Sequence, residues 1–221
     1  MCGRFVRDKP VSEIAEAFGV ERIASDLAPS YNIAPTQMVA AIIFDDVKQL
    51  VPLKWGLIPS WADDPAIGNR MINARAETIT EKASFKNAFK KRRCLVAADG
   101  FYEWKKVGDS KRPYFIRLKS GRPFGFAGLY ENWTSPDGER ISSCAIITTE
   151  ANEFMQPIHN RMPVILSKGE EDLWLAGGEN DLLALLKPYP SENMEAYEVS
   201  RIVNSPSNNS SDCIKPIGAR A

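Results

Sequence analysis

Cys94-Leu95-Val96-Ala97-Ala98 runs directly into Asp99-Gly100 and then into Phe101-Tyr102-Glu103-Trp104. The first five residues are apolar and predict a buried strand, and the Asp-Gly pair predicts a tight turn. The aromatic residues that follow predict a second strand. Segments 94–98 and 101–104 therefore indicate that the core of this protein is built from short strands that are connected by turns.

The rest of the chain continues this pattern of short elements. Further strands are expected at 38–44, 50–57, 114–118, 125–130 and 144–149, and short helices at 11–19, 82–90, 151–155, 170–175 and 181–186. No repeat and no interdomain linker interrupts them. The sequence therefore predicts the α+β class, with one domain over residues 1–221 and an antiparallel, barrel-like sheet. Residues after about 203 are expected to form a polar tail or loop.

The composition limits the class of protein to which this chain can belong, because it bears on core size, membrane contact, compartment and metal binding. The chain has 221 residues and 44% hydrophobic residues, enough for one sizeable core. It contains no apolar run of about 18 residues and no signal-peptide pattern, so we expect no membrane contact and a cytoplasmic location, near the nucleoid in a bacterium. The four cysteines are scattered and the chain has one histidine. This predicts a reducing compartment, no metal site and no cofactor.

The charges are divided unevenly along the chain. Lys and Arg balance Asp and Glu at 28 each, which argues against a generic nucleic-acid binder. Residues 1–120, however, hold 20 basic against 14 acidic side chains, and residues 121–221 hold 8 against 14. Such a basic half can present a positive groove, but a solvated surface with a chance division explains the counts equally well.

The N-terminal residues Met1-Cys2-Gly3-Arg4 offer unusual chemistry. Removal of Met1 would give Cys2 a free α-amine beside its thiol, with ordinary pKa values of about 7.7–8.0 and about 8.5. An amine attacks an aldehyde to form a Schiff base, and the neighbouring sulfur can close the imine to a thiazolidine. The alternative is that the chain begins with Met-Cys by chance.

Two internal segments place charged side chains among apolar or small residues. Glu103 lies between Tyr102 and Trp104, where burial would raise its pKa and suit it to general acid or base catalysis; alternatively it faces water on an ordinary strand. Asn73-Ala74-Arg75-Ala76-Glu77 combines an amide, a guanidinium and a carboxylate. An Asn can orient an amine and an Arg can bind a phosphate, but an ordinary surface turn has the same composition.

Two further features are candidates for binding or catalysis. Ile158-His159-Asn160-Arg161-Met162-Pro163 contains the single histidine, which is either structural or the one imidazole available near neutral pH. Trp55, Trp61 and Pro35 lie in proline-containing loops, where tryptophans either stack on unpaired bases or cover the rim of the core.

Taken together, these segments resemble one known family. Met1–Arg4, Tyr31-Asn32-Ile33-Ala34-Pro35, Trp55–Trp61, Asn73–Glu77, Asp99–Trp104 and His159–Pro163 occur in the order and spacing of the SOS-response-associated peptidase (SRAP) proteins, also called abasic-site processing proteins. The resemblance covers most of residues 1–166 and weakens after about residue 170. It implies one domain with a mixed, mainly antiparallel barrel-like β core, peripheral short helices and a positively charged cleft.

The resemblance also implies a function and a set of site residues. The cleft of that family binds single-stranded DNA and single-to-double-strand junctions, and Cys2 matches the nucleophile that captures the aldehyde of an abasic site. Asn73 matches the residue that orients the amine, Glu103 the acid/base and His159 the residue that assists ring opening and reversal. Arg4, Arg75 and Arg161 match phosphate contacts, and Pro35 and Trp61 match loops that wedge against bases. A monomer is the default expectation.

Three functional hypotheses remain open from the sequence. The first is an enzyme that captures abasic DNA covalently, with lyase-like activity and a peptidase activity that removes Met1. The second is a cysteine peptidase in which Cys2 attacks a peptide carbonyl and His159 is the base. The third is a non-enzymatic module that binds DNA strands. Only thiazolidine formation requires Cys2 at the very N-terminus, so N-terminal extension separates the first two.

Overall fold

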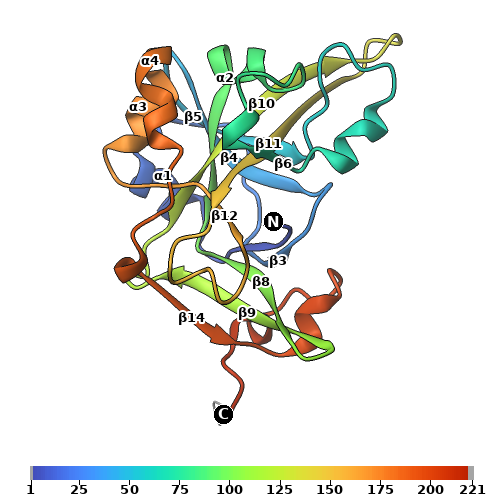
Figure 1. Cartoon of the computed structure of the whole chain (residues 1–221). Helices are drawn as coiled ribbons and strands as arrows, with labels where there is room; N and C mark the ends of the chain where they lie inside the picture. Colours follow the sequence, from blue (N-terminus) through green and yellow to red (C-terminus); the bar gives the residue numbers. More distant parts are fainter. Residues whose placement is uncertain (1, 219–221) are drawn as a thin grey trace.

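The computed structural model describes residues 2–218, and a five-stranded barrel forms the upper half of the molecule in Figure 1. The barrel strands are β4 (Met38–Asp45), β5 (Val47–Trp55), β7 (Arg93–Ala98), β10 (Phe124–Thr134) and β11 (Arg140–Glu150). Neighbours pair antiparallel in the order β11-β10-β7-β4-β5, and parallel pairing of β5 with β11 closes the circle. The expected mixed, mainly antiparallel, barrel-like core is confirmed.

A second sheet lies beside the barrel and has the order β14-β9-β8-β1-β3. Its strands are β1 (Phe5–Arg7), β3 (Ser30–Ile33), β8 (Gly100–Val107), β9 (Ser110–Leu118) and β14 (Met194–Glu198). The two strands predicted within 94–104 exist, but β7 belongs to the barrel and β8 to this second sheet. β8 begins at Gly100. A larger residue does not fit there, because a Cβ at this position would lie 2.3 Å from the ring of Phe115.

Short helices surround the barrel, as the resemblance implies. They are α1 (Val11–Phe18), α2 (Lys86–Lys91), α3 (Glu170–Ala176) and α4 (Glu179–Leu182), together with 3-10 turns at Pro65–Arg70, Ala76–Thr78, Leu183–Leu185, Ser191–Asn193, Arg201–Asn204 and Ser211–Ile214. In α1, Val11, Ile14 and Phe18 recur at helical spacing and pack on the barrel, and Gly19 ends the helix with a φ of 64°.

The expected helix at 151–155 is wrong. Hydrogen-bonded turns replace it: the Asn152 side-chain oxygen accepts from the Met155 N–H at 2.8 Å and caps the turn as it would cap a helix. Pro157 follows two residues later and has no backbone N–H to donate, so the helical hydrogen bonds cannot continue. The helix expected over 82–90 begins only at Lys86, and the one expected over 181–186 is divided between α4 and a 3-10 turn.

Several strands of two or three residues are too short to show alternation in the sequence. They are β2 (Arg22–Ile23), β6 (Asn73–Arg75), β12 (Arg161–Pro163) and β13 (Ile165–Leu166). Two of them matter for function, because β6 and β12 lie on either side of the same residue of β11. Thr148 is the register partner of Arg75 in β6 and of Pro163 in β12.

The segment after residue 203, predicted as a polar tail or loop, packs against the start of the chain. The Asn32 amide donates to the carbonyls of Val203, Ser205 and Asn208 at 3.2, 3.0 and 2.7 Å. Cys213 is buried in the same region. No helix among the described residues has the length and apolar composition needed to cross a membrane.

Candidate active site

Cys2 lies at the centre of the site, immediately before β1. It is fully buried and belongs to the apolar cluster that includes Phe5 and Trp55. The Asn73 Nδ2 donates to the Cys2 backbone oxygen at 2.8 Å. The indole N–H of Trp55 donates to the Ile72 carbonyl at 2.9 Å, which fixes the backbone next to Asn73. Asn73 therefore lies against the Cys2 backbone.

The side-chain oxygen of Asn73, Oδ1, is available to accept a hydrogen bond. Asn73 Oδ1 is buried and accepts no hydrogen bond from the described part of the chain. A buried acceptor without a donor is unfavourable, so such an atom commonly marks a position where a ligand or a reacting group binds. Because Nδ2 is held by the Cys2 carbonyl, Oδ1 is the atom left to accept from an amine at the N-terminus.

Glu103 reaches the same region from the second sheet. The Tyr102 N–H donates to the Arg4 carbonyl at 2.9 Å, and Phe5 pairs with Phe101, so Glu103 lies beside Gly3 in the continued register. Its side chain is buried, at 4% exposure. Burial raises the pKa of Glu103 from 4.5 to about 7. The alternative in which Glu103 faces water is excluded, and the expected raised pKa is confirmed.

The pKa of the Cys2 thiol differs from that of an exposed cysteine. Burial, and next the negative charge of Glu103, raise the pKa of the Cys2 thiol above its ordinary value. The thiol is therefore protonated at neutral pH. The same effect shows that Glu103 lies close enough to Cys2 to act on it electrostatically.

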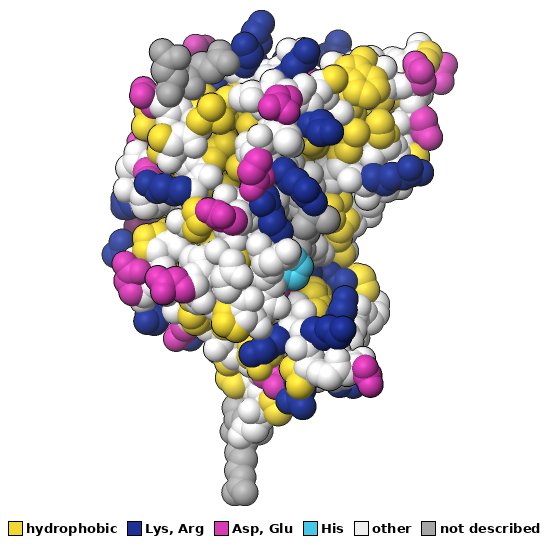
Figure 2. All heavy atoms as spheres, viewed as in Figure 1, with side chains coloured by type: hydrophobic (Ala, Val, Ile, Leu, Met, Phe, Trp, Pro, Cys, Tyr) yellow, Lys and Arg dark blue, Asp and Glu magenta, His cyan; other side chains and the backbone are white. Residues whose placement is uncertain are grey.

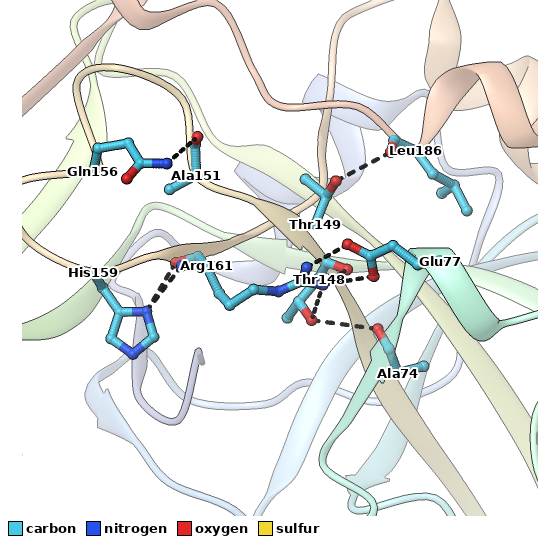
Figure 3. A network of polar contacts seen from close by, with 9 residues as sticks. All are labelled: Ala74, Glu77, Thr148, Thr149, Ala151, Gln156, His159, Arg161 and Leu186. Atoms are coloured by element: carbon cyan, nitrogen blue, oxygen red, sulfur yellow. Dashed lines mark hydrogen bonds and ion pairs between the residues drawn. The ribbon is translucent and has the colours of Figure 1, made fainter.

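His159 lies in the loop that leads into β12 (Figure 3). Its Nδ1 accepts from the Arg161 backbone N–H at 3.0 Å, so the neutral ring carries its proton on Nε2. The Arg161 carbonyl, at 3.3 Å from the same nitrogen, can accept a hydrogen bond from Nδ1 if that nitrogen is protonated. Burial lowers the pKa of His159, and nearby positive charges lower it further. The ring is therefore neutral near pH 7.

Lys111 on β9 is a site residue that the sequence analysis missed. Its positive charge lowers the pKa of both Glu103 and His159, although burial remains the largest influence on each. One lysine is therefore close enough to both side chains to act on them electrostatically. The sequence alone does not distinguish Lys111, because it is one of several lysines in the β8–β9 hairpin.

The three predicted phosphate-binding arginines have different surroundings. Arg75 is exposed at the end of β6, two residues after Asn73, and forms no ion pair with a described residue. The Arg161 guanidinium, in contrast, is already bound by other groups of the protein. Its two terminal nitrogens bind both carboxylate oxygens of Glu77, and Nη2 also donates to the Thr148 carbonyl at 2.7 Å (Figure 3). The sequence analysis noted Glu77 but assigned it no role.

Arg4 lies on the opposite face of the second sheet from Glu103. Its Nη1 donates to Asn32 Oδ1 and to the Val203 carbonyl, both at 2.8 Å, and its guanidinium lies 5.9 Å from the Trp104 ring centroid. The structure therefore does not bring the Arg4 side chain to Cys2 and Asn73. It also reveals a role for Asn32, which connects Arg4 to the C-terminal segment.

Pro35 and Trp61 lie in turns that are held rigidly. Pro35 precedes Thr36, whose φ of 74° is unusual for a residue other than glycine, and the Thr36 N–H donates to the Trp55 carbonyl at 2.8 Å. The Trp61 ring is 57% exposed, while its neighbour Ala62 is fixed by the Trp133 indole N–H at 2.7 Å. An exposed indole on a braced turn is suited to stacking on a base.

The surface around these residues is hollowed and rich in basic side chains. Figure 2 shows a hollow in this face of the molecule, with the single histidine at its edge and Lys or Arg side chains on both sides. No group of three or more His, Cys, Asp or Glu residues capable of holding a metal ion exists between residues 2 and 218.

Comparison with known proteins identifies relatives along nearly the whole chain. The chain is 48% identical to the abasic site processing protein YoqW of Bacillus subtilis (strain 168) over 222 residues, which covers 97% of this chain and 99% of that one. It is 35% identical to the abasic site processing protein HMCES of Xenopus tropicalis, covering 86% of this chain and 66% of the relative.

Solved structures agree with these sequence relationships. A crystal structure of a protein from Bacteroides thetaiotaomicron superposes with a TM-score of 0.89 at 30% identity, over 97% of this chain and 99% of that chain. A protein from Bordetella bronchiseptica superposes with a TM-score of 0.80 at 26% identity, over 90% and 100% of the two chains. The family model described as SOS response associated peptidase (SRAP) matches residues 1–206, and the chain belongs to that family.

Proposed function

We propose that this protein processes abasic sites in DNA by capturing the ring-opened sugar aldehyde on its N-terminal cysteine. The observation that carries the proposal is the position of Asn73, whose Nδ2 holds the Cys2 carbonyl while its buried Oδ1 remains available beside it. Once Met1 has been removed, this oxygen can accept a hydrogen bond from the Cys2 amine and direct the nitrogen lone pair toward an aldehyde. The names of the relatives, abasic site processing proteins, support this substrate.

The chemistry balances without a cofactor. The Cys2 nitrogen adds to the C1′ aldehyde to give a carbinolamine, and a proton delivered to its hydroxyl lets water depart and leaves an imine. The Cys2 sulfur then adds to the imine carbon, and the thiol proton is transferred to the nitrogen to complete a thiazolidine. Glu103, with a pKa raised to about 7, supplies the proton for the departing water. Reversal uses the same steps in the opposite order.

His159 fits a role on the sugar rather than on the thiol. Its neutral ring presents Nε2–H, while Nδ1 is held by residue 161. A neutral imidazole can donate an Nε2–H hydrogen bond to the ring oxygen of the closed sugar. As the ring opens, the proton lost from the C1′ hydroxyl ends on that oxygen, and the imidazole is neutral before and after the step.

The cysteine peptidase alternative fits the electrostatics less well. Such an enzyme requires a thiolate, whose pKa is lowered by a neighbouring imidazolium. Here burial and the charge of Glu103 raise the pKa of the Cys2 thiol instead. A protonated thiol that closes an imine already formed by the amine agrees better with this environment. A peptidase step limited to the removal of Met1 is compatible with the family name.

The partner that we propose is single-stranded DNA, or a junction of single- and double-stranded DNA, that carries an abasic site. The exposed Trp61 ring can stack on an unpaired base, and the exposed Arg75 can bind a phosphate next to Asn73. We propose a monomer as the active form. The roles of Arg161 and Pro35 in DNA binding are part of the same proposal, whereas Arg4, whose side chain binds Asn32 and the Val203 carbonyl, is assigned a structural role.

An N-terminal extension tests the proposed function directly. A chain with a protease-cleavable extension before Cys2 should form no cross-link to an oligonucleotide with one abasic site, because its cysteine nitrogen is an amide. Cleavage of the same protein to expose Cys2 should restore the cross-link on a denaturing gel, and intact mass confirms each N-terminus. A cross-link of equal yield before cleavage would rule out the thiazolidine mechanism.

The arginines should separate into binding and structural residues. Arg75→Ala should weaken binding of all single-stranded sequences similarly and reduce the slope of log affinity against log salt by about 0.7, the loss of roughly one phosphate contact. Arg4→Ala should mainly lower the melting temperature, because it leaves Asn32 Oδ1 and the Val203 carbonyl without their donor. Fluorescence anisotropy over a salt series and thermal unfolding measure the two effects. An unchanged slope in Arg75→Ala contradicts the predicted contact.

A further inference from the structure

The Arg161 guanidinium is held by two partners of different character (Figure 3). Nη2 donates to the Thr148 carbonyl at 2.7 Å, within the β11–β12 pairing. Glu77 binds both terminal nitrogens, with Nη2 to Oε2 at 3.0 Å. The Glu77 side chain is 50% exposed, whereas that of Arg161 is 17% exposed. One partner is therefore fixed backbone and the other is a side chain that can leave.

A carboxylate in this position resembles a phosphate. An arginine presents parallel N–H groups that bind the two oxygens of a carboxylate or of a phosphate with the same geometry. If the Glu77 carboxylate moves away, the Thr148 carbonyl still accepts from Nη2, so the guanidinium keeps its position. The N–H groups that Glu77 had bound, here called the Arg161 fork, then become available to a phosphate. Glu77 belongs to a three-residue 3-10 turn, Ala76–Thr78, in which its side chain can rotate outward without moving a strand.

The charge of Glu77 also acts on a second arginine. The hydrogen bond from Arg161 is the largest influence that lowers the pKa of Glu77, and the charge of Arg75 lowers it as well. Glu77 is therefore ionised at neutral pH and reduces the positive potential at both arginines. These two of the three predicted phosphate-binding arginines flank Asn73 and His159, so this potential acts directly at the proposed path of the DNA backbone.

We propose that Glu77 is a built-in competitor for the DNA backbone, which occupies the Arg161 fork until a phosphate displaces it. This inference rests on the proposed function and specifies how the same site is regulated. The competition weakens binding of intact single strands, which gain nothing further after Glu77 is displaced. A strand with an abasic site gains a covalent bond, so the same cost affects its final occupancy less. Glu77 thereby lowers the occupancy of intact strands, while abasic strands still reach full covalent occupancy.

The test compares Glu77→Gln with wild-type protein on intact and abasic single-stranded oligonucleotides. Gln keeps the size of the side chain but removes the charge, so intact DNA should bind about 3- to 10-fold more tightly, and the salt slope should steepen by about 0.7. The final yield of cross-link to abasic DNA, measured on a denaturing gel, should equal that of wild-type protein, because the covalent bond holds the strand once it has formed. A structural brace would behave oppositely: its loss would loosen Arg161 and weaken binding.

A matched control separates the local effect from net charge. Glu195→Gln removes the same charge from a partly exposed carboxylate that pairs with Arg117 at 2.6 Å on the β9–β14 edge of the second sheet. It should leave affinity and salt slope at wild-type values. In an Arg161→Gln background, Glu77→Gln should no longer increase affinity, because the fork for which Glu77 competes is absent.

The outcomes distinguish this inference from the proposed function. Weaker or unchanged binding by Glu77→Gln, or an equal gain from Glu195→Gln, overturns the competition. A gain that persists fully in the Arg161→Gln background also overturns it. If wild-type protein with Cys2 exposed forms no cross-link with abasic DNA, the proposed function itself fails, whatever the affinity of Glu77→Gln for intact strands.

Discussion

Cys2→Ala is expected to abolish the abasic-site cross-link that survives denaturation, the largest effect of any single substitution in this chain. Removal of the sulfur leaves the amine able to form an imine, but imines hydrolyse readily and no ring can close on them. Treatment with a hydride reductant should therefore trap the imine in Cys2→Ala and Cys2→Ser. Weak, salt-sensitive binding to intact strands should remain, because Arg75 and Trp61 are unchanged.

Cys213→Ser is the matched control for this experiment. Cys213 is also fully buried, and its thiol donates to the Asn208 carbonyl at 3.4 Å, a hydrogen bond that a serine can keep. It should cross-link abasic DNA like wild-type protein. A stable cross-link with Cys2→Ala in the absence of reductant would sink the mechanism and direct attention to another nucleophile.

Glu103→Gln is expected to slow both formation and reversal of the cross-link by about 100- to 10,000-fold, the usual range for loss of general acid–base catalysis. Gln keeps the shape and the capacity for hydrogen bonds but cannot transfer a proton. Because the pKa of Glu103 is raised to about 7, the wild-type rate of formation should fall as the pH rises through about 7. That part of the pH profile should be absent in Glu103→Gln.

The stability of the two proteins provides an independent check of that pKa. The folded protein binds a proton on Glu103 up to about pH 7, whereas the ordinary value is 4.5. The folded state thus holds more protons than the unfolded state between these values, and wild-type stability is lost as the pH rises through this window. Glu103→Gln lacks this loss, so its melting temperature relative to wild type should increase from pH 5 to pH 8.

Glu131→Gln is the control for a buried carboxylate outside the site. Glu131 is 6% exposed and pairs with Arg92 at 2.6 Å on the barrel strand β10. Its substitution should change stability without changing the rate of capture. Equal rates for Glu103→Gln and wild-type protein across pH would make Glu103 a structural residue and transfer the acid/base role to His159.

Much of this architecture could be predicted from local sequence signals. The apolar run 94–98, the Asp-Gly turn and the aromatic strand that follows specify their own conformation, because alternation and turn chemistry act over a few residues. The helix over Val11–Phe18 followed its apolar spacing and its glycine for the same reason. The chemistry of an N-terminal cysteine was also evident, since an aminothiol depends only on covalent structure.

Other elements and strand pairings could not be predicted from local sequence signals. The strands β6 and β12 are three residues long, and they form because β11 offers them hydrogen-bonding partners on both sides. The parallel contact of β5 with β11 that closes the barrel joins residues about 90 positions apart.

The sequence alone determined which residue types the site contains: a cysteine that Met1 removal can expose, an amide, a carboxyl between aromatic residues and one histidine. Only the tertiary structure decided which of their atoms are available. It left the Asn73 Oδ1 without a donor among residues 2–218, raised the pKa of Glu103 and placed Glu77 on the Arg161 fork. The reason is physical: burial, pKa and hydrogen-bond competition depend on neighbours from distant parts of the chain, and the order of residues does not specify those neighbours locally.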